Sequence, residues 1–118
     1  MRVTNLLGHK NQYLVWHNDT AYFQSYDTVM CKVEQTDSGN TLTMISNYWS
    51  VTTGKHMRTF LYETDMLDAV HDLIYKYKHF STYKDFMQRA HTVKKSFNGI
   101  ITVEYTDTKG ELVTYICV

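Results

Sequence analysis

The polar residues best suited to chemistry gather in one short segment, SVTTGKHMR, where a strand-like pattern gives way to a helix-like one. Its candidate binding residues are Thr52, Thr53, Lys55, His56 and Arg58. Hydroxyls, the free amides of a first helical turn and two cations can hold a phosphate or a carboxylate. The segment is not a P-loop, because it lacks the glycine spacing and a Ser or Thr after the lysine. We favour a simpler interpretation, in which hydroxyls cap the helix, both cations face solvent and the histidine is partly buried.

A second cluster interleaves aromatic and cationic side chains a little further along the chain. Its candidate binding residues are Tyr75, Lys76, Tyr77, Lys78 and Tyr83. Such a mixture can stack nucleic-acid bases and contact phosphates. Lysines at the end of a helix also balance the helix dipole. We favour this second explanation, because no acid-free basic face can be drawn around the cluster.

Signatures of metal binding and of catalysis are weak. Among six histidines no two are four residues apart, and the two cysteines are far apart in the sequence, so the usual spacing of a zinc site is missing. No local pattern supports a nucleophile or a pair of catalytic carboxylates. We therefore expect no catalytic residue, no metal and no cofactor. Cys31 and Cys117 are expected to be free thiols, with a disulfide between them as the open alternative.

Three strands are predicted in the first half of the chain. Residues 12–17 are rich in β-forming side chains, and residues 21–35 form a longer alternating strand with a bulge or bend near its middle. Residues 36–40 carry hairpin turn chemistry. Residues 41–49 then alternate again, which predicts a three-stranded antiparallel meander.

The apolar period changes to that of a helix after Ser50. Met57, Phe60 and Leu61 share one helical face, and Ser50 or a following threonine can cap the helix. A second helix is predicted from residue 64 or 65. Acidic residues at its start and lysines at its end favour it.

A third helix is predicted after Thr82, which has the capping-box spacing with Asp85. Helical spacing continues through four apolar residues, namely Phe86, Ala90, Val93 and Phe97. We therefore favour helix over residues 92–97, ended by Asn98-Gly99. The alternative is a strand over the same residues, with Asn98-Gly99 as the turn of a hairpin.

The fold class follows from the order of these elements. Residues 100–106 and 111–117 alternate as strands around the turn 107–110, so the expected order is β-β-β-α-α-α-β-β. This order predicts an α+β fold with a mainly antiparallel sheet of about five strands and helices packed on one face.

Composition narrows the class of protein. The chain has 118 residues, 12 basic and 12 acidic, and 43% of its residues are apolar. These values predict one globular domain over residues 1–118 and disfavour a polycationic nucleic-acid binder. No apolar run is long enough for a membrane helix, so we expect no membrane partner and a cytoplasmic location. Ten of the 118 residues are tyrosine. Because tyrosine concentrates at protein interfaces, this number favours a binding surface.

One part of the chain resembles an uncharacterised family of small phage- and plasmid-encoded proteins. The residues that carry the likeness are Ser25-Tyr26-Asp27-Thr28 and, after a hairpin, Tyr48 to His56. That family pairs an S-Y-x-T strand with a Y-S-x-T-T-x-K-H junction of strand and helix; here Trp49 separates the tyrosine from the serine. The resemblance covers about a third of the chain. It implies a mobile-element origin and a strand-hairpin-helix core, and it implies no activity.

We therefore expect a non-enzymatic protein that covers a site on a host or viral protein in the host cytoplasm. Inhibition of a host defence protein would be one instance. The alternative is a nucleic-acid-associated protein that uses the two basic and aromatic clusters. An enzyme or small-molecule binder with a pocket at the strand-to-helix junction ranks third. A homodimer through the C-terminal strand, residues 111–117, is a further open alternative.

Overall fold

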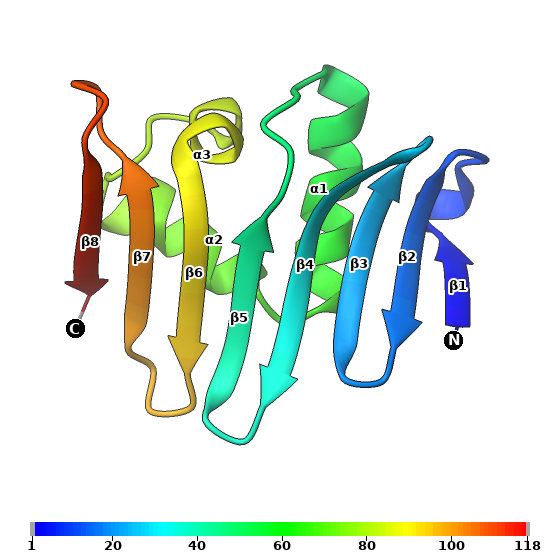
Figure 1. Ribbon diagram of the computed structural model, residues 1–118, viewed down its shortest axis with the longest axis horizontal. Helices are drawn as coiled ribbons and strands as arrows, with labels where there is room; N and C mark the ends of the chain where they lie inside the picture. Colours follow the sequence, from blue (N-terminus) through cyan, green and yellow to red (C-terminus); the bar gives the residue numbers. More distant parts are fainter. Residues whose placement is uncertain (1, 118) are drawn as a thin grey trace.

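A single antiparallel sheet dominates the computed structural model, which describes residues 2–117. Its eight strands lie side by side in the order of the sequence, so that each pairs with the next (Figure 1). The strands are β1 (Arg2–Asn5), β2 (Gln12–His17), β3 (Thr20–Ser25), β4 (Thr28–Thr36), β5 (Gly39–Met44), β6 (Ala90–Ser96), β7 (Ile101–Thr106) and β8 (Leu112–Cys117). The predicted α+β class is confirmed, whereas the predicted number of about five strands is wrong.

All of the longer helices lie between β5 and β6 in the sequence and cover one face of the sheet (Figure 1). They are α1 (Val51–Glu63), α2 (Leu67–His71), which continues directly into the π-helical segment η2 (Asp72–Lys76), and α3 (Tyr83–Arg89). A short 3-10 turn, η1 (Leu6–Gly8), joins β1 to β2. We call the sheet face under the helices the inner face and the opposite one the open face.

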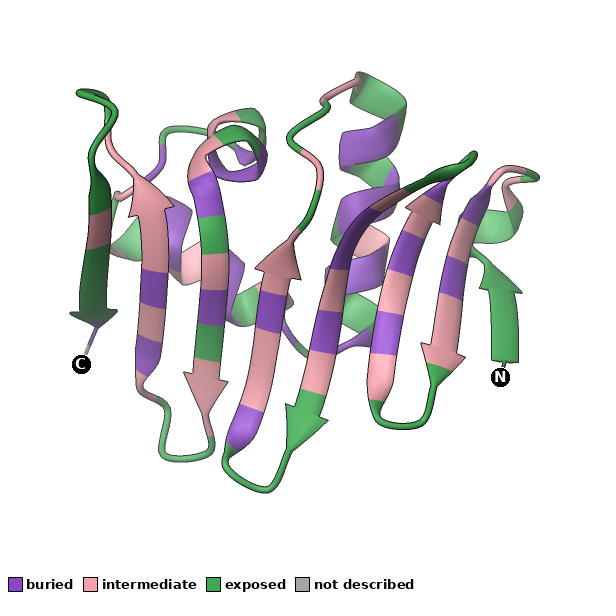
Figure 2. Ribbon diagram, viewed as in Figure 1, coloured by how far each residue is buried: buried purple, intermediate pink, exposed green. Residues whose placement is uncertain are grey.

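The core forms between the inner face and the helices. Apolar side chains alternate along the strands, so that buried positions recur as bands across the sheet (Figure 2). Phe23 of β3 stacks on Phe60 of α1 with ring centroids 5.7 Å apart. Each such fully buried side chain contributes roughly 1.5–3 kcal/mol. Val33, Leu42 and Val103 continue this layer through β4, β5 and β7.

Two of the three additional strands, and the length of β5, have local causes. The predicted strand 21–35 is divided by a tight turn in which Tyr26 adopts a φ of 53°, so it forms β3 and β4. β1 was not predicted, because all four of its residues are exposed and show no alternation. The predicted strand 41–49 is shorter than expected and ends at Met44.

The third helix is the clearest correction, since α3 ends at Arg89 and residues 90–96 form β6. A bulge at His91 interrupts the pairing of β6 with β7. The bulge places Ala90 and Val93, which are three residues apart, on the same buried face. Their spacing therefore imitates a helix. The turn after β6 is closed by Gly99, whose φ is 86° and whose N–H donates to Ser96 O at 2.9 Å.

The first two predicted helices are confirmed. Ser50 caps α1, and its hydroxyl accepts a hydrogen bond from the Thr53 N–H at 3.0 Å. The second helix runs through α2 and η2. The predicted cap of α3 also forms, since Thr82 Oγ1 accepts from the Asp85 N–H at 3.1 Å.

Candidate functional site

The junction of β5 and α1 uses its hydroxyls for capping. The Ser50 hydroxyl also donates to Thr53 Oγ1 at 2.8 Å, and Thr53 is buried. Both hydroxyls are therefore engaged in the first turn of the helix, while Thr52 stays exposed. The cap is Ser50, and of the two candidate threonines only Thr52 is free to meet a partner.

His56 lies inside the molecule rather than on its surface. It is 3% exposed, and its ring packs edge-on against that of His9 with centroids 4.9 Å apart. Burial lowers the pKa of His56, and the neighbouring His9 and Lys55 lower it further. Its Nδ1 is buried and has no hydrogen-bond partner among residues 2–117. These surroundings favour the neutral imidazole and a structural role.

The side of α1 that faces away from the sheet carries a mixed stripe. Val51, Lys55, Arg58 and Tyr62 follow one another at helical spacing, and all four are exposed. The two members at the ends are large hydrophobic side chains that stand in solvent, Val51 at 82% and Tyr62 at 70% exposed. A solvent-facing stripe with large hydrophobic side chains at both ends and cations between them is typical of a contact surface.

Tertiary packing joins this stripe to the second sequence cluster. The Arg58 guanidinium lies over the ring of Tyr83 from α3, 4.9 Å from its centroid. Tyr83 packs edge-on against His71 at 5.5 Å, and His71 packs on Tyr75 at 5.6 Å. Burial raises the pKa of Tyr83 to about 12, against the opposing charge of Arg58. Tyr75 itself is exposed. We call Val51, Lys55, Arg58, Tyr62 and Tyr75 together the helical-layer surface.

The remaining residues of the second cluster lie at the end of η2. Lys76 Nζ lies over the ring of the following residue, Tyr77, 5.2 Å from its centroid. Lys78 is exposed and has a φ of 57°, a conformation that ends the helix. Among residues 2–117, no hydrogen bond, ion pair or aromatic contact joins these three residues to the α1 stripe.

Arg89, which has no place in either sequence cluster, holds the other end of the helical layer together. Its Nε and Nη2 donate to both oxygens of Asp85 at 2.7 and 2.8 Å, which lowers the pKa of that carboxyl to about 2. It also donates to the backbone oxygens of Thr106 and His79. A hollow of about 800 Å³ adjoins this group and reaches Tyr75. The i, i+4 spacing of Asp85 and Arg89 could have indicated the pair from the sequence.

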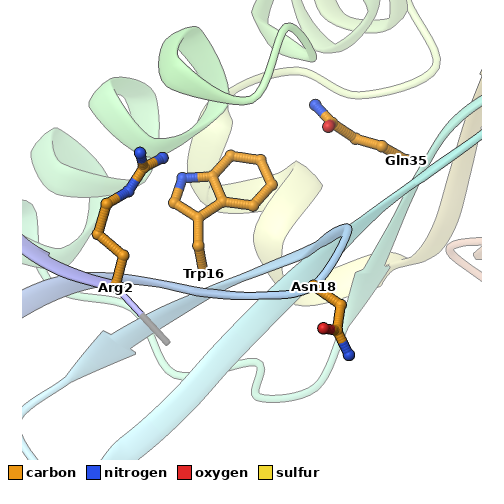
Figure 3. Close-up of a pocket in the computed structure, with 4 residues that line it drawn as sticks. All are labelled: Arg2, Trp16, Asn18 and Gln35. Carbon is orange, nitrogen blue, oxygen red and sulfur yellow. The ribbon is translucent and has the colours of Figure 1, made fainter.

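A second hollow lies near the edge of the sheet formed by β1 and has a volume of about 550 Å³. Figure 3 shows the side chains of Arg2, Trp16 and Gln35 on one side of the sheet, whereas Asn18 points away from them. The set offers an indole face beside a guanidinium. The sequence contains no signal for it, because β1 is not recognisable and the residues come from three strands and one turn.

The expectation that both cysteines are free thiols is confirmed. Cys31 and Cys117 are both free and buried, and burial raises the pKa of each thiol. Among residues 2–117, no three His, Cys, Asp or Glu side chains come together in a way that would hold a metal ion. In the same range, no helix has both the length and the apolarity needed to cross a membrane.

Comparison with known proteins places the chain in a family. The model described as a family of unknown function, DUF8033, matches residues 2–79, which is well over half of the chain. The chain belongs to the DUF8033 family. The part that DUF8033 matches runs from β1 to just beyond η2 and contains the whole helical-layer surface, whereas Tyr83 and Arg89 lie beyond it. No curated protein and no solved structure matches the chain.

Proposed function

We propose that this DUF8033 member is a non-enzymatic binding protein that docks on another protein through its helical-layer surface. The observation that carries the proposal is the solvent-facing stripe of α1, in which Val51 and Tyr62 stand exposed around Lys55 and Arg58. A few side chains carry most of the binding free energy of a protein interface, and tyrosine and arginine are frequent among them. The packed rings between Arg58 and Tyr75 hold the surface in one shape, which lowers the entropic cost of docking.

The class of partner is the second part of the proposal. Likeness to small phage and plasmid proteins supports a mobile-element origin, and therefore a host or viral protein of the cytoplasm as the target. Inhibition of a host defence protein is the activity that we propose for such a binder. The two cations at the centre of the stripe favour a partner with an acidic patch, because complementary charge guides docking.

The test compares two exposed aromatic positions. We expect the unchanged chain to capture a stoichiometric partner from host lysate and the Tyr62→Ser variant to lose it. Phe97→Ser is the matched control, because Phe97 is 75% exposed in the β6–β7 turn, as Tyr62 is 70% exposed on α1. Binding by the unchanged chain and the control should exceed that of Tyr62→Ser by roughly tenfold or more. Equal capture by all three proteins, or no stoichiometric partner, would contradict the proposal.

Nucleic-acid association is the second candidate. It is supported by the exposed Lys55, Arg58, Lys76 and Lys78 near Tyr75 in the same helical layer. Contacts to phosphates predict binding that weakens steeply as salt rises. Mobility shifts with single- and double-stranded DNA and with RNA at low salt decide between the two candidates. A salt-sensitive shift that is lost in Lys55→Glu would replace the protein-binding proposal.

A further inference from the structure

The two edges of the sheet are protected to different degrees. β1 is four residues long, contains Arg2 and runs into η1, where Leu7 has a φ of 51°. β8 has six residues, with no charge and no proline from Leu112 to Cys117. Nothing within residues 2–117 lies beyond β8 (Figure 1). A long uncharged edge with unpaired backbone amides and carbonyls is a template for another strand.

β8 is also held rigidly in an extended shape. It pairs with β7 along its whole length, from Leu112 opposite Thr106 to Cys117 opposite Ile101. The turn before it is closed by Asp107, whose Oδ1 accepts from the N–H groups of Lys109 and Glu111 at 2.8 and 2.9 Å. A strand already fixed in this way loses little entropy when it pairs again.

Side chains of β8 are divided between the two faces of the sheet. Tyr115 lies on the inner face, where its ring packs on that of His79 with centroids 4.3 Å apart. Leu112, Thr114 and Ile116 therefore lie on the open face. Leu112 is 65% exposed and Ile116 59% exposed, so two aliphatic side chains stand in solvent on either side of the threonine.

We propose that β8 pairs antiparallel with β8 of a second copy of this chain, with the two-fold axis midway between the two Thr114 residues. Alternation of side chains requires that one residue of the strand faces its own copy across the axis, since otherwise inner and open positions would face each other. This register places Leu112 opposite Ile116 of the second copy, twice, and Val113 opposite Tyr115 on the other face. Each exposed aliphatic gains an apolar neighbour, and no like charges meet.

The second copy fits better than any pairing through β1. A symmetric pair of β1 strands is only four residues long, and each strand carries the charge of Arg2. A pair between β1 of one copy and β8 of the next leaves a free edge at each end, so it would continue into an open filament. The symmetric β8 pair closes after two copies. Its axis is perpendicular to the sheet, so both helical layers lie on the same side.

The first test measures mass against concentration by analytical ultracentrifugation. We expect the unchanged chain to dimerise and Ile116→Lys to raise the dimer dissociation constant by roughly tenfold or more, because both Leu112–Ile116 pairs are lost. Val3→Lys is the matched control on the opposite edge, where Val3 is 52% exposed. It should leave the dimer unchanged. Circular dichroism melting of each variant shows that the fold is kept.

The register has its own test. In the double variant Leu112→Glu/Ile116→Lys, the proposed register places opposite charges across the axis twice, so the dimer should return relative to Ile116→Lys alone. An unchanged chain that stays monomeric would overturn the proposal. So would loss of association in Val3→Lys, open-ended assembly, or a double variant that associates no better than Ile116→Lys. None of these results depends on the proposed partner of the helical-layer surface.

Discussion

At the scale of single residues, Gln12 at the start of β2 and His56 in α1 are buried polar side chains with atoms that lack a hydrogen-bond partner among residues 2–117. Gln12 is fully buried, and neither atom of its amide group has a hydrogen-bond partner among residues 2–117. Burial lowers the pKa of His56, and the neighbouring His9 and Lys55 lower it further. A buried polar group without a partner costs roughly 1–3 kcal/mol. Protonation of His56 would place a charge in this buried environment and should therefore lower stability.

Acid should weaken the fold through His56. Its pKa in the folded chain lies below the usual 6.5, so between that lowered pKa and 6.5 the unfolded chain binds more protons than the folded one. The free energy of unfolding should fall as the pH drops below 6.5, by at most about 1.4 kcal/mol per pH unit from this group. Urea unfolding between neutral and mildly acidic pH measures the slope.

A matched pair of variants tests whether His56 causes this pH dependence of the free energy of unfolding. His56→Gln should flatten it, and His17→Gln should leave it unchanged because His17 is exposed at the end of β2. His79, whose pKa is also lowered by burial, supplies the slope that remains in His56→Gln. The same slope in all three proteins would show that His56 does not control the acid response.

At the scale of elements, α1 contains a glycine at which a side chain from outside the helix packs directly against the helix backbone. Gly54 lies in its first turns and would cost the helix up to about 1 kcal/mol relative to alanine. In the structure, however, a Cβ on Gly54 would overlap the ring of Trp49. The glycine allows the indole to pack against the helix, and Trp49 in turn packs against the core. Packing therefore outweighs propensity at this position.

Gly54→Ala should consequently destabilise the protein by about 1–3 kcal/mol, the usual cost of overpacking. In a chain that already carries Trp49→Leu, the same change should stabilise it, because the overlap with the ring is gone and the propensity gain is left. Thermal and urea unfolding of the four proteins of this cycle give the coupling free energy. A stabilising effect in both backgrounds would contradict the packing explanation.

At the scale of the whole molecule, the meander makes stability uneven across the sheet. β4 and β5 are each paired on both sides and carry buried residues such as Val33 and Leu42. Within residues 2–117, β1 has a neighbouring strand on one side only, and all of its residues are exposed. Strand pairing and burial set the cost of local opening.

Hydrogen exchange should therefore be slowest for the amides of β4 and β5 and fastest for those of β1. Exchange at the other edge strand, β8, also tests the proposed dimer, because pairing with a second copy would protect the amides that face away from β7. Exchange followed by NMR at low and high protein concentration measures both effects. Protection of β1 equal to that of β4 would contradict the expected gradient.

Local patterns predicted a large part of this fold. The cap at Ser50, the cap at Thr82 and the hairpin after β7 were recognisable because each rests on residues close together in the sequence. The first two helices and the one-sided packing of the sheet followed from apolar periodicity. The ten tyrosines and the basic clusters pointed to a binding surface, which stays a prediction.

Only the tertiary structure decided the remainder, because it depends on contacts between distant segments. Residues 90–96 form β6 rather than helix, since β5 and β7 supply partners on both sides and a bulge at His91 hides the strand alternation. Arg58 meets Tyr83 although 25 positions separate them in the sequence. The sequence by itself determined which segments could form helices, strands and turns; their pairing determined which of these forms each ambiguous segment took.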